Sequence, residues 1–375
     1  MHKLFHCIAG LLISCFTFCQ STVVLLEGKI DKYPVVMEIN TYDTNCTVKY
    51  FYLNQRKDIT LDGTVDSKGA IKVAFTGMDD NKVKERFELT PAAGGYTGAW
   101  FSGNKSLPVS LVRTTVEKLK NPYSNLPGII KLGSESAFDY AKTAGMVFIK
   151  SKTTKQGIAE FDWYKEKYSG IELPRLKSGY SASAIKKIND VLLERHLIQS
   201  SNFLGCTAGD NGEYHVSLEQ IFAHNYILSL NIFYDYYCGG AHPDEGSEGV
   251  NFDGLTGDLL NLDDVIRFNK VKPPAENSDA WYEYRQKTFA PGLVALLNKL
   301  HPEEMKPQGA DGDQCDYSDI EPWQFPNWYF TEKGLYMDPS FPHVAMNCGS
   351  PEWSFIPYKY VKGLLAPSSK LKLPE

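Results

Sequence analysis

Residues 22–113 show a regular succession of short apolar runs separated by turn-forming residues. Within this stretch Ile59–Gly63 alternates with period two, which is typical of a half-buried strand. The expected strands are Val23–Ile30, Val35–Ile39, Val48–Leu53, Ile59–Val65, Ile71–Phe75, Arg86–Leu89, Tyr96–Phe101 and Leu107–Val112. This pattern predicts an all-β module over residues 22–113, either a small barrel or a sandwich.

Three glycines inside these runs, Gly28, Gly63 and Gly98, are expected to mark bends or close approaches of the backbone. The pattern predicts no helix after any of them. A dinucleotide-binding loop is therefore excluded, because that loop lies between a strand and a helix.

The rest of the chain mixes strand and helix patterns. Residues 114–135 are broken by Asn121-Pro122, Pro127-Gly128 and Gly133, which is typical of a linker. Residues 136–375 predict an α+β domain in which helices are segregated from an antiparallel sheet. The expected strands are Phe161–Glu172, Tyr214–Phe222, Tyr226–Tyr236, Trp328–Thr331 and Leu335–Met337; the expected helices run from Ser181 or Ser183 to Ile198, from Ser278 to Leu300 with a kink at Pro291, and from Tyr358 to Leu365.

The first residues have the pattern of an export signal. Lys3 is followed by an apolar run from Cys7 to Phe18, with no acidic residue before Gln20. This run is too short to span a bilayer, so we expect a signal peptide over residues 1–19 and a periplasmic or secreted protein. Leu12–Cys15 resembles a lipobox, and the alternative is a lipid anchor on Cys15. No later segment is apolar for long enough to cross a membrane, so no transmembrane segment is expected after signal removal.

Five cysteines lie beyond the signal. Widely spaced cysteines in an exported protein favour disulfides over metal ligands, and no metal or cofactor is expected. We expect Cys46 to stay unpaired, because it lies in a different sequence region from the others. The remaining four, Cys206, Cys238, Cys315 and Cys348, allow three pairings between which the sequence does not choose.

The composition and net charge limit the classes of partner that the chain is expected to bind. With 43% hydrophobic and 13% aromatic residues, the chain is able to bury a sizeable core. A net charge of -6 argues against nucleic acid as a partner and suits a cationic one.

The most distinctive block begins at Tyr236 and contains Gly-Gly-Ala-His-Pro at residues 239–243. We expect a strand to end at Cys238 and Gly239-Gly240 to turn with positive φ. A second turn is expected at Asp253–Asp258, followed by a short helix from Leu262, capped by Asn261 or by nearby acids.

The block GGAHP, followed by NFD-x-x-TG-x-x-L-x-L-D-D, resembles the PdaC/RsiV-like extracellular domain. That domain is found in RsiV-type anti-sigma factors and in PdaC-type peptidoglycan deacetylases. Residues 329–336 and 356–365 are similar to its C-terminal hairpin and its closing strand and helix, and the likeness covers roughly residues 140–366. The resemblance implies binding of lysozyme, as in the anti-sigma factors. The chain lacks their transmembrane helix and the Thr-Phe-Asp-Asp-Gly motif of the deacetylases, so neither signalling nor deacetylation is supported.

The candidate binding residues are His242, Asp244, Asp253, Trp328 and His343. Cys238 and two nearby acids make His242 a candidate for a nucleophile pair or a metal site. A turn in which the imidazole bonds nearby backbone is favoured, because a disulfide-bonded Cys238 is no nucleophile. No catalytic residue is assigned.

Two further clusters lie near the C-terminus. Asp311–Asp319 holds four carboxylates without the spacing of an EF-hand, which favours a solvated acidic loop over a calcium site. Tryptophan, tyrosine and phenylalanine are dense between residues 323 and 355, where core packing competes with a sugar-stacking platform or an interface.

The leading hypothesis is a non-catalytic protein of the cell envelope that binds lysozyme or another cationic wall hydrolase. The first alternative is an envelope enzyme that acts on peptidoglycan glycan or peptide through His242 with Asp253 or His343. The second alternative is a purely structural envelope module.

Overall fold

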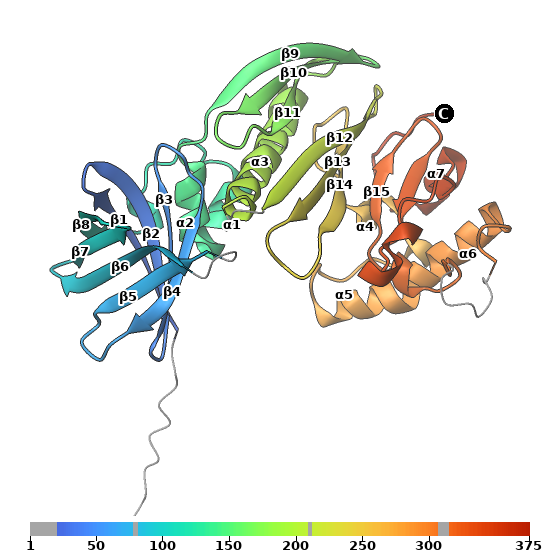
Figure 1. The fold of residues 1–375 in the computed structure, drawn as a ribbon. Coiled ribbons are helices and arrows are strands. Elements are labelled where there is room, and N and C mark those ends of the chain that lie inside the picture. The colour runs from blue at the N-terminus through green and yellow to red at the C-terminus, as the bar shows by residue number, and fades with distance from the viewer. Residues whose placement is uncertain (1–20, 78–81, 209–211, 307–314) are drawn as a thin grey trace, which may run out of the picture. The chain divides into compact units, whose positions relative to one another are not determined.

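The computed structural model describes residues 21–77, 82–208, 212–306 and 315–375. The signal segment with Cys15 and the acids Asp311 and Asp313 lie outside these residues. The chain divides into two compact units, one formed by Met1–Asn54 and Ile59–Lys118 and the other by Gln55–Asp58 and Leu119–Glu375. Figure 1 colours the first unit blue to teal and the second green to red.

The first unit is a closed antiparallel barrel of eight strands, and each predicted run forms one of them. In order, they are β1 (Thr22–Ile30), β2 (Tyr33–Tyr42), β3 (Asn45–Tyr52), β4 (Ile59–Val65), β5 (Ile71–Thr76), β6 (Val83–Ala92), β7 (Gly95–Ser102) and β8 (Lys105–Arg113). Each pairs with the next, and β8 pairs with β1. The interior is filled by side chains that alternate along the strands, such as Leu26, Met37 and Phe87, which are fully buried.

The three glycines of this unit are sites of close approach, as expected. A Cβ atom added to Gly28, Gly63 or Gly98 would lie 2.0 Å from a carbonyl oxygen of the adjacent strand. Only a residue without a side chain allows the sheet to close so tightly at these points.

The second unit contains three antiparallel sheets of three strands each (Figure 1). The first has β9 (Phe148–Gln156), β10 (Ala159–Glu166) and β11 (Glu172–Ser178); the second has β12 (Glu213–Ala223), β13 (Ile227–Tyr237) and β14 (Asp244–Asp253); the third has β15 (Asn327–Phe330), β16 (Leu335–Asp338) and β17 (Phe355–Ile356). In the first sheet β10 is central and β9 is an edge strand that carries three lysines.

Seven α-helices occur in the part of the chain that the structure describes, all of them in this unit. They are α1 (Pro127–Glu135), α2 (Ala137–Thr143), α3 (Ala182–Cys206), α4 (Leu262–Val265), α5 (Asp279–Tyr284), α6 (Ala290–Leu300) and α7 (Tyr358–Leu364). Ser181 caps α3 by accepting a hydrogen bond from the Ala184 N–H, and Asn261 caps α4. A π-helical turn, Arg285–Phe289, joins α5 to α6, and Pro291 lies in the first turn of α6. None of the described helices is long and apolar enough to cross a membrane.

Several details differ from the sequence-based prediction: α2 was not expected, α3 extends beyond Ile198 to Cys206, and only Gly239 of the Gly239-Gly240 pair has a positive φ. The predicted strand Phe161–Glu172 is divided, because β10 ends at Glu166 and Gly170 turns the chain with φ of +75° before β11. The predicted linker contains α1, so the second unit begins at Leu119. Strands β9 and β14 were not predicted, because β9 is polar and largely exposed, and β14 is polar until its buried residues 250–252.

Candidate functional site

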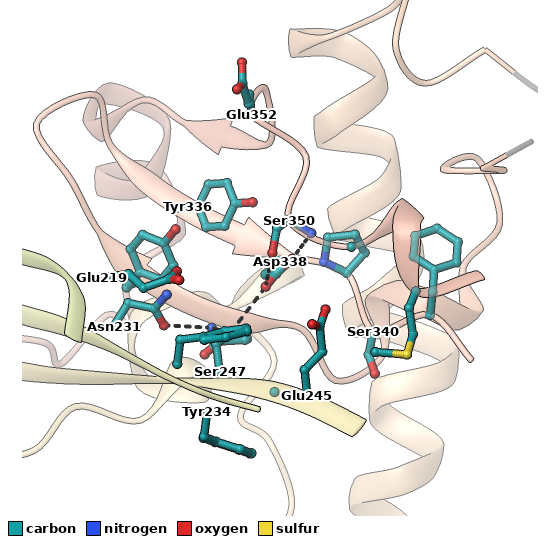
Figure 2. A pocket seen from close by; sticks show the side chains of 18 of the residues that line it. Glu219, Asn231, Tyr234, Glu245, Ser247, Tyr336, Asp338, Ser340, Ser350 and Glu352 are labelled. Carbon is teal, nitrogen blue, oxygen red and sulfur yellow. Dashed lines mark hydrogen bonds between the residues drawn. The ribbon is translucent and has the colours of Figure 1, made fainter. Parts of the chain in front are cut away.

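The second unit contains an open groove with a volume of about 880 Å³. It lies between the second and third sheets and is bordered by the segment after β16. Figure 2 shows it from close by, with Glu245 on β14, Asp338 at the end of β16 and Glu352 on the following loop. We call it the acidic groove.

A seam of hydrogen bonds holds the two sheets of the groove together. Asn327 at the start of β15 accepts from the Gly249 N–H at 2.7 Å and donates to Ser247 Oγ at 2.7 Å. On the other side, the Phe330 N–H donates to Ser229 Oγ at 2.9 Å. The groove is therefore a fixed junction rather than a gap between loose elements, because each bond joins strands of different sheets.

Asp338 occupies the centre of the groove. Its Oδ1 accepts from the Ser350 N–H at 2.6 Å, and its Oδ2 accepts from Ser350 Oγ at 3.3 Å and Ser247 Oγ at 3.5 Å (Figure 2). Burial raises the pKa of this carboxyl, and the charge of Glu219 adds to the rise, although the bonds from Ser350 oppose it. A cation placed beside Asp338 would reverse this cost, since an opposite charge favours the ionised form.

Two tyrosines stand beside that carboxylate. The rings of Tyr329 and Tyr336 lie 4.7 Å apart between centroids. Burial and the charges of Asp338 and Glu219 raise the pKa of Tyr329 to about 12, and burial and Asp338 also raise the pKa of Tyr336. Aromatic faces next to carboxylates form an environment that suits ammonium or guanidinium groups. The carboxylates attract these cations by Coulomb interaction, and the ring faces attract them by cation–π interaction.

Charge in the groove is strongly one-sided. Four carboxylates line it, from Glu219, Glu245, Asp338 and Glu352, against one lysine, Lys333. A smaller hollow of about 160 Å³ shares Glu245 and Met346 with it. That hollow adds three more carboxylates, which belong to Glu213, Asp235 and Asp244.

The two candidate histidines come together, although they are 101 positions apart. The rings of His242 and His343 lie 3.7 Å apart between centroids, and a nitrogen of each lies within 3.2 Å of the Pro243 carbonyl oxygen. Both side chains are exposed, at the edge of the smaller hollow. Neither ring has a carboxylate partner among the hydrogen bonds of the described residues. The pair thus lacks the orienting acid of a nucleophile–base arrangement.

The other three candidates form no hydrogen bond with this pair among the described residues. Asp244 accepts from Tyr236 Oη at 3.1 Å on the wall of the smaller hollow. Asp253 accepts from the N–H groups of Leu255 and Thr256, so it shapes the turn after β14. Trp328 is half-buried and lines a different pocket.

Two disulfides are present. Cys206 at the end of α3 is bonded to Cys238 after β13, and Cys315 is bonded to Cys348 at the end of a 3₁₀-helix, η5 (His343–Cys348). Cys46 is a free, buried thiol in the barrel, whose pKa burial raises to about 11. The second disulfide anchors the segment that supplies Met346 and Gly349 to the acidic groove.

No group of three or more His, Cys, Asp or Glu side chains that could hold a metal occurs within the described ranges. The groove residues Glu219, Glu245 and Asp338 were not among the sequence candidates. The sequence pattern that could have pointed to the groove is the alternation along β12, which puts Glu219 on the exposed face of the strand. The pattern does not say which residues lie opposite that face.

No family model and no curated protein matches the chain. Among solved structures it is similar to a DUF3298 family protein from Pseudomonas aeruginosa, with 14% sequence identity and a TM-score of 0.23. The match covers 56% of this chain and 95% of the other. A likeness at this TM-score carries no argument about function, so the resemblance to the PdaC/RsiV-like domain rests on the sequence motifs alone.

Proposed function

We propose that the chain is an exported, non-catalytic protein of the cell envelope with a PdaC/RsiV-like second unit, and that its acidic groove binds a cationic protein such as lysozyme or another cationic wall hydrolase. The observation that carries the proposal is the lining of the groove, four carboxylates against one lysine, with aromatic rings between them. Complementary charge speeds encounter and selects the partner, while the buried aromatic surface contributes affinity.

The two disulfides support export, since such bonds persist in oxidising compartments. For the enzymatic alternative, the exposed pair His242 and His343 is the one group of predicted residues whose side chains meet.

The test is calorimetric titration of purified residues 21–375 with lysozyme at low and at physiological salt. We expect a saturable complex that weakens as salt rises, because salt screens exposed charges over a distance of about 8–10 Å. Cytochrome c, a basic protein that is no hydrolase, is the control for attraction by charge alone. The absence of a complex at low salt, or equal affinity for both proteins, would overturn the proposal.

A further inference from the structure

A second pocket in the same unit has a different lining, in which arginines and aromatic rings accompany one acid, Glu276. Its volume is about 270 Å³, and it lies beside the acidic groove, with which it shares Phe325. Its walls hold three aromatic rings, from Trp281, Phe325 and Trp328, and two guanidinium groups, from Arg195 and Arg285. We call it the arginine–tryptophan pocket.

Arg285 is the unusual member of this pocket. It is only 5% exposed, and its Nη2 lies 3.0 Å from Asp263 Oδ1. Its Nε and Nη1 are buried without a hydrogen-bond partner among the described residues. The guanidinium lies between rings, 4.3 Å from the centroid of Phe289 and 5.0 Å from that of Trp281. Buried donors left unpaired are costly, and a ligand acceptor would satisfy them.

Arg195 supplies a second, accessible cation. Its Nε donates to Glu248 at 2.5 Å, its side chain is 25% exposed, and it reaches the pocket from α3. The opposing charges are Glu248, Asp263 and the exposed Glu276, whose carboxylate accepts from Asn261 Nδ2 at 3.4 Å. The pocket therefore holds two donor-only groups: Arg195 donates to Glu248 through Nε, and Arg285 forms an ion pair with Asp263.

The aromatic walls of the pocket indicate which apolar group the ligand carries. Trp281 and Phe325 have ring centroids 5.2 Å apart, and Phe325 is 43% exposed, so part of its ring is open to a ligand. Flat aromatic faces pack against the apolar faces of sugar rings. A pocket of about 270 Å³ is at the small end of ligand sites, which suits one ring rather than a chain.

We infer that the arginine–tryptophan pocket binds a single sugar ring that carries a carboxylate. The ring packs against the aromatic walls, and the carboxylate accepts from Arg195 and from the unpaired edge of Arg285. Guanidinium pairs with carboxylate through two parallel hydrogen bonds, which a neutral hydroxyl does not reproduce. This inference does not rest on the proposed binding of a cationic protein, since the two sites share Phe325 alone.

The test compares N-acetylmuramic acid with N-acetylglucosamine, which has the same ring without the lactyl carboxylate. Titration of residues 21–375 is followed by tryptophan fluorescence, because Trp281 and Trp328 form the walls. We expect a saturable change with the acidic sugar and binding of the neutral sugar that is at least about tenfold weaker, as the loss of a charged hydrogen bond predicts.

Arg195→Gln is the decisive variant, and Lys186→Gln is its matched control. Lys186 is an exposed cation of the same helix that does not line the pocket. Arg195→Gln should remove the preference for the acidic sugar, and Lys186→Gln should preserve it. No saturable binding, equal binding of the two sugars, or an unchanged preference in a folded Arg195→Gln protein would each overturn the inference. Circular dichroism of both variants verifies the fold.

Discussion

The acidic groove and the arginine–tryptophan pocket share one aromatic side chain, Phe325, yet differ in charge and in size. The groove is large, open and lined by carboxylates, whereas the pocket is small, aromatic and lined by arginines. The carboxylates of the groove are mostly exposed, so they attract a cationic partner over a distance, and single substitutions among them should have small effects. Arg285 in the pocket is buried and lacks partners, so it discriminates at close range. Under the two proposals, the surface for a protein and the site for a small molecule differ in burial as well as in charge.

The largest expected effect comes from the disulfide that bounds only the groove. In a Cys315→Ser, Cys348→Ser double variant, we expect a loss of about 3.7 kcal/mol in unfolding free energy, because the bond closes a loop with a sequence separation of 33. Binding of lysozyme should fall with it, while binding of the acidic sugar persists, since neither cysteine lines the pocket. Urea unfolding and the two titrations provide the measurements, and loss of both activities in a folded protein would contradict the separation.

Charge reversal in the groove should come next. A Glu219→Lys, Glu245→Lys protein is expected to bind lysozyme at least about tenfold more weakly at low salt, because attraction becomes repulsion at two positions. Glu304→Lys, which changes one exposed acid outside both sites, is the control for net charge. Acidic-sugar binding that fell in parallel would show that the two sites are not independent.

The pH dependence of Asp338 gives a smaller effect. Its pKa is raised in the fold, so the folded protein holds this proton more tightly than the unfolded chain does. Stability from this group is therefore greatest below the ordinary pKa of Asp, and it is lost as pH rises through the raised value. Asp338→Asn should lack this loss, so its unfolding free energy should fall less between pH 4 and pH 7 than that of the wild type. Equal slopes would show that burial does not shift this carboxyl.

The smallest effect is expected from the shared ring. Phe325 is 43% exposed, so Phe325→Ala should change stability by no more than about 1 kcal/mol. Lysozyme binding should weaken about threefold, which corresponds to the loss of one exposed cation–π contact. Surface plasmon resonance would measure it, and an effect as large as that of charge reversal would mean that Phe325 is the anchor of the groove.

Sequence predicted the parts of this protein in which local pattern decides structure. The eight barrel strands follow from alternation, and the cap of α3 follows from Ser181. The edge strand β9 escaped prediction because it is exposed along most of its length, so no apolar period marks it. The groove escaped because Glu219 and Asp338 are ordinary surface acids until β12 and β16 bring them to one place.

The three lysines of the edge strand β9 have a consequence for behaviour at high concentration. An unpaired strand edge is a template for a second molecule, and sheets that extend from chain to chain aggregate. Lys150, Lys152 and Lys155 lie along this strand, the first two in ion pairs with Asp162 and Glu172 of the same sheet, and a second copy would have to bring its own three lysines against them. The barrel needs no such protection, because its β1–β8 pairing leaves no edge. The polar sequence that made β9 hard to predict thus also disfavours pairing of this edge with a second molecule.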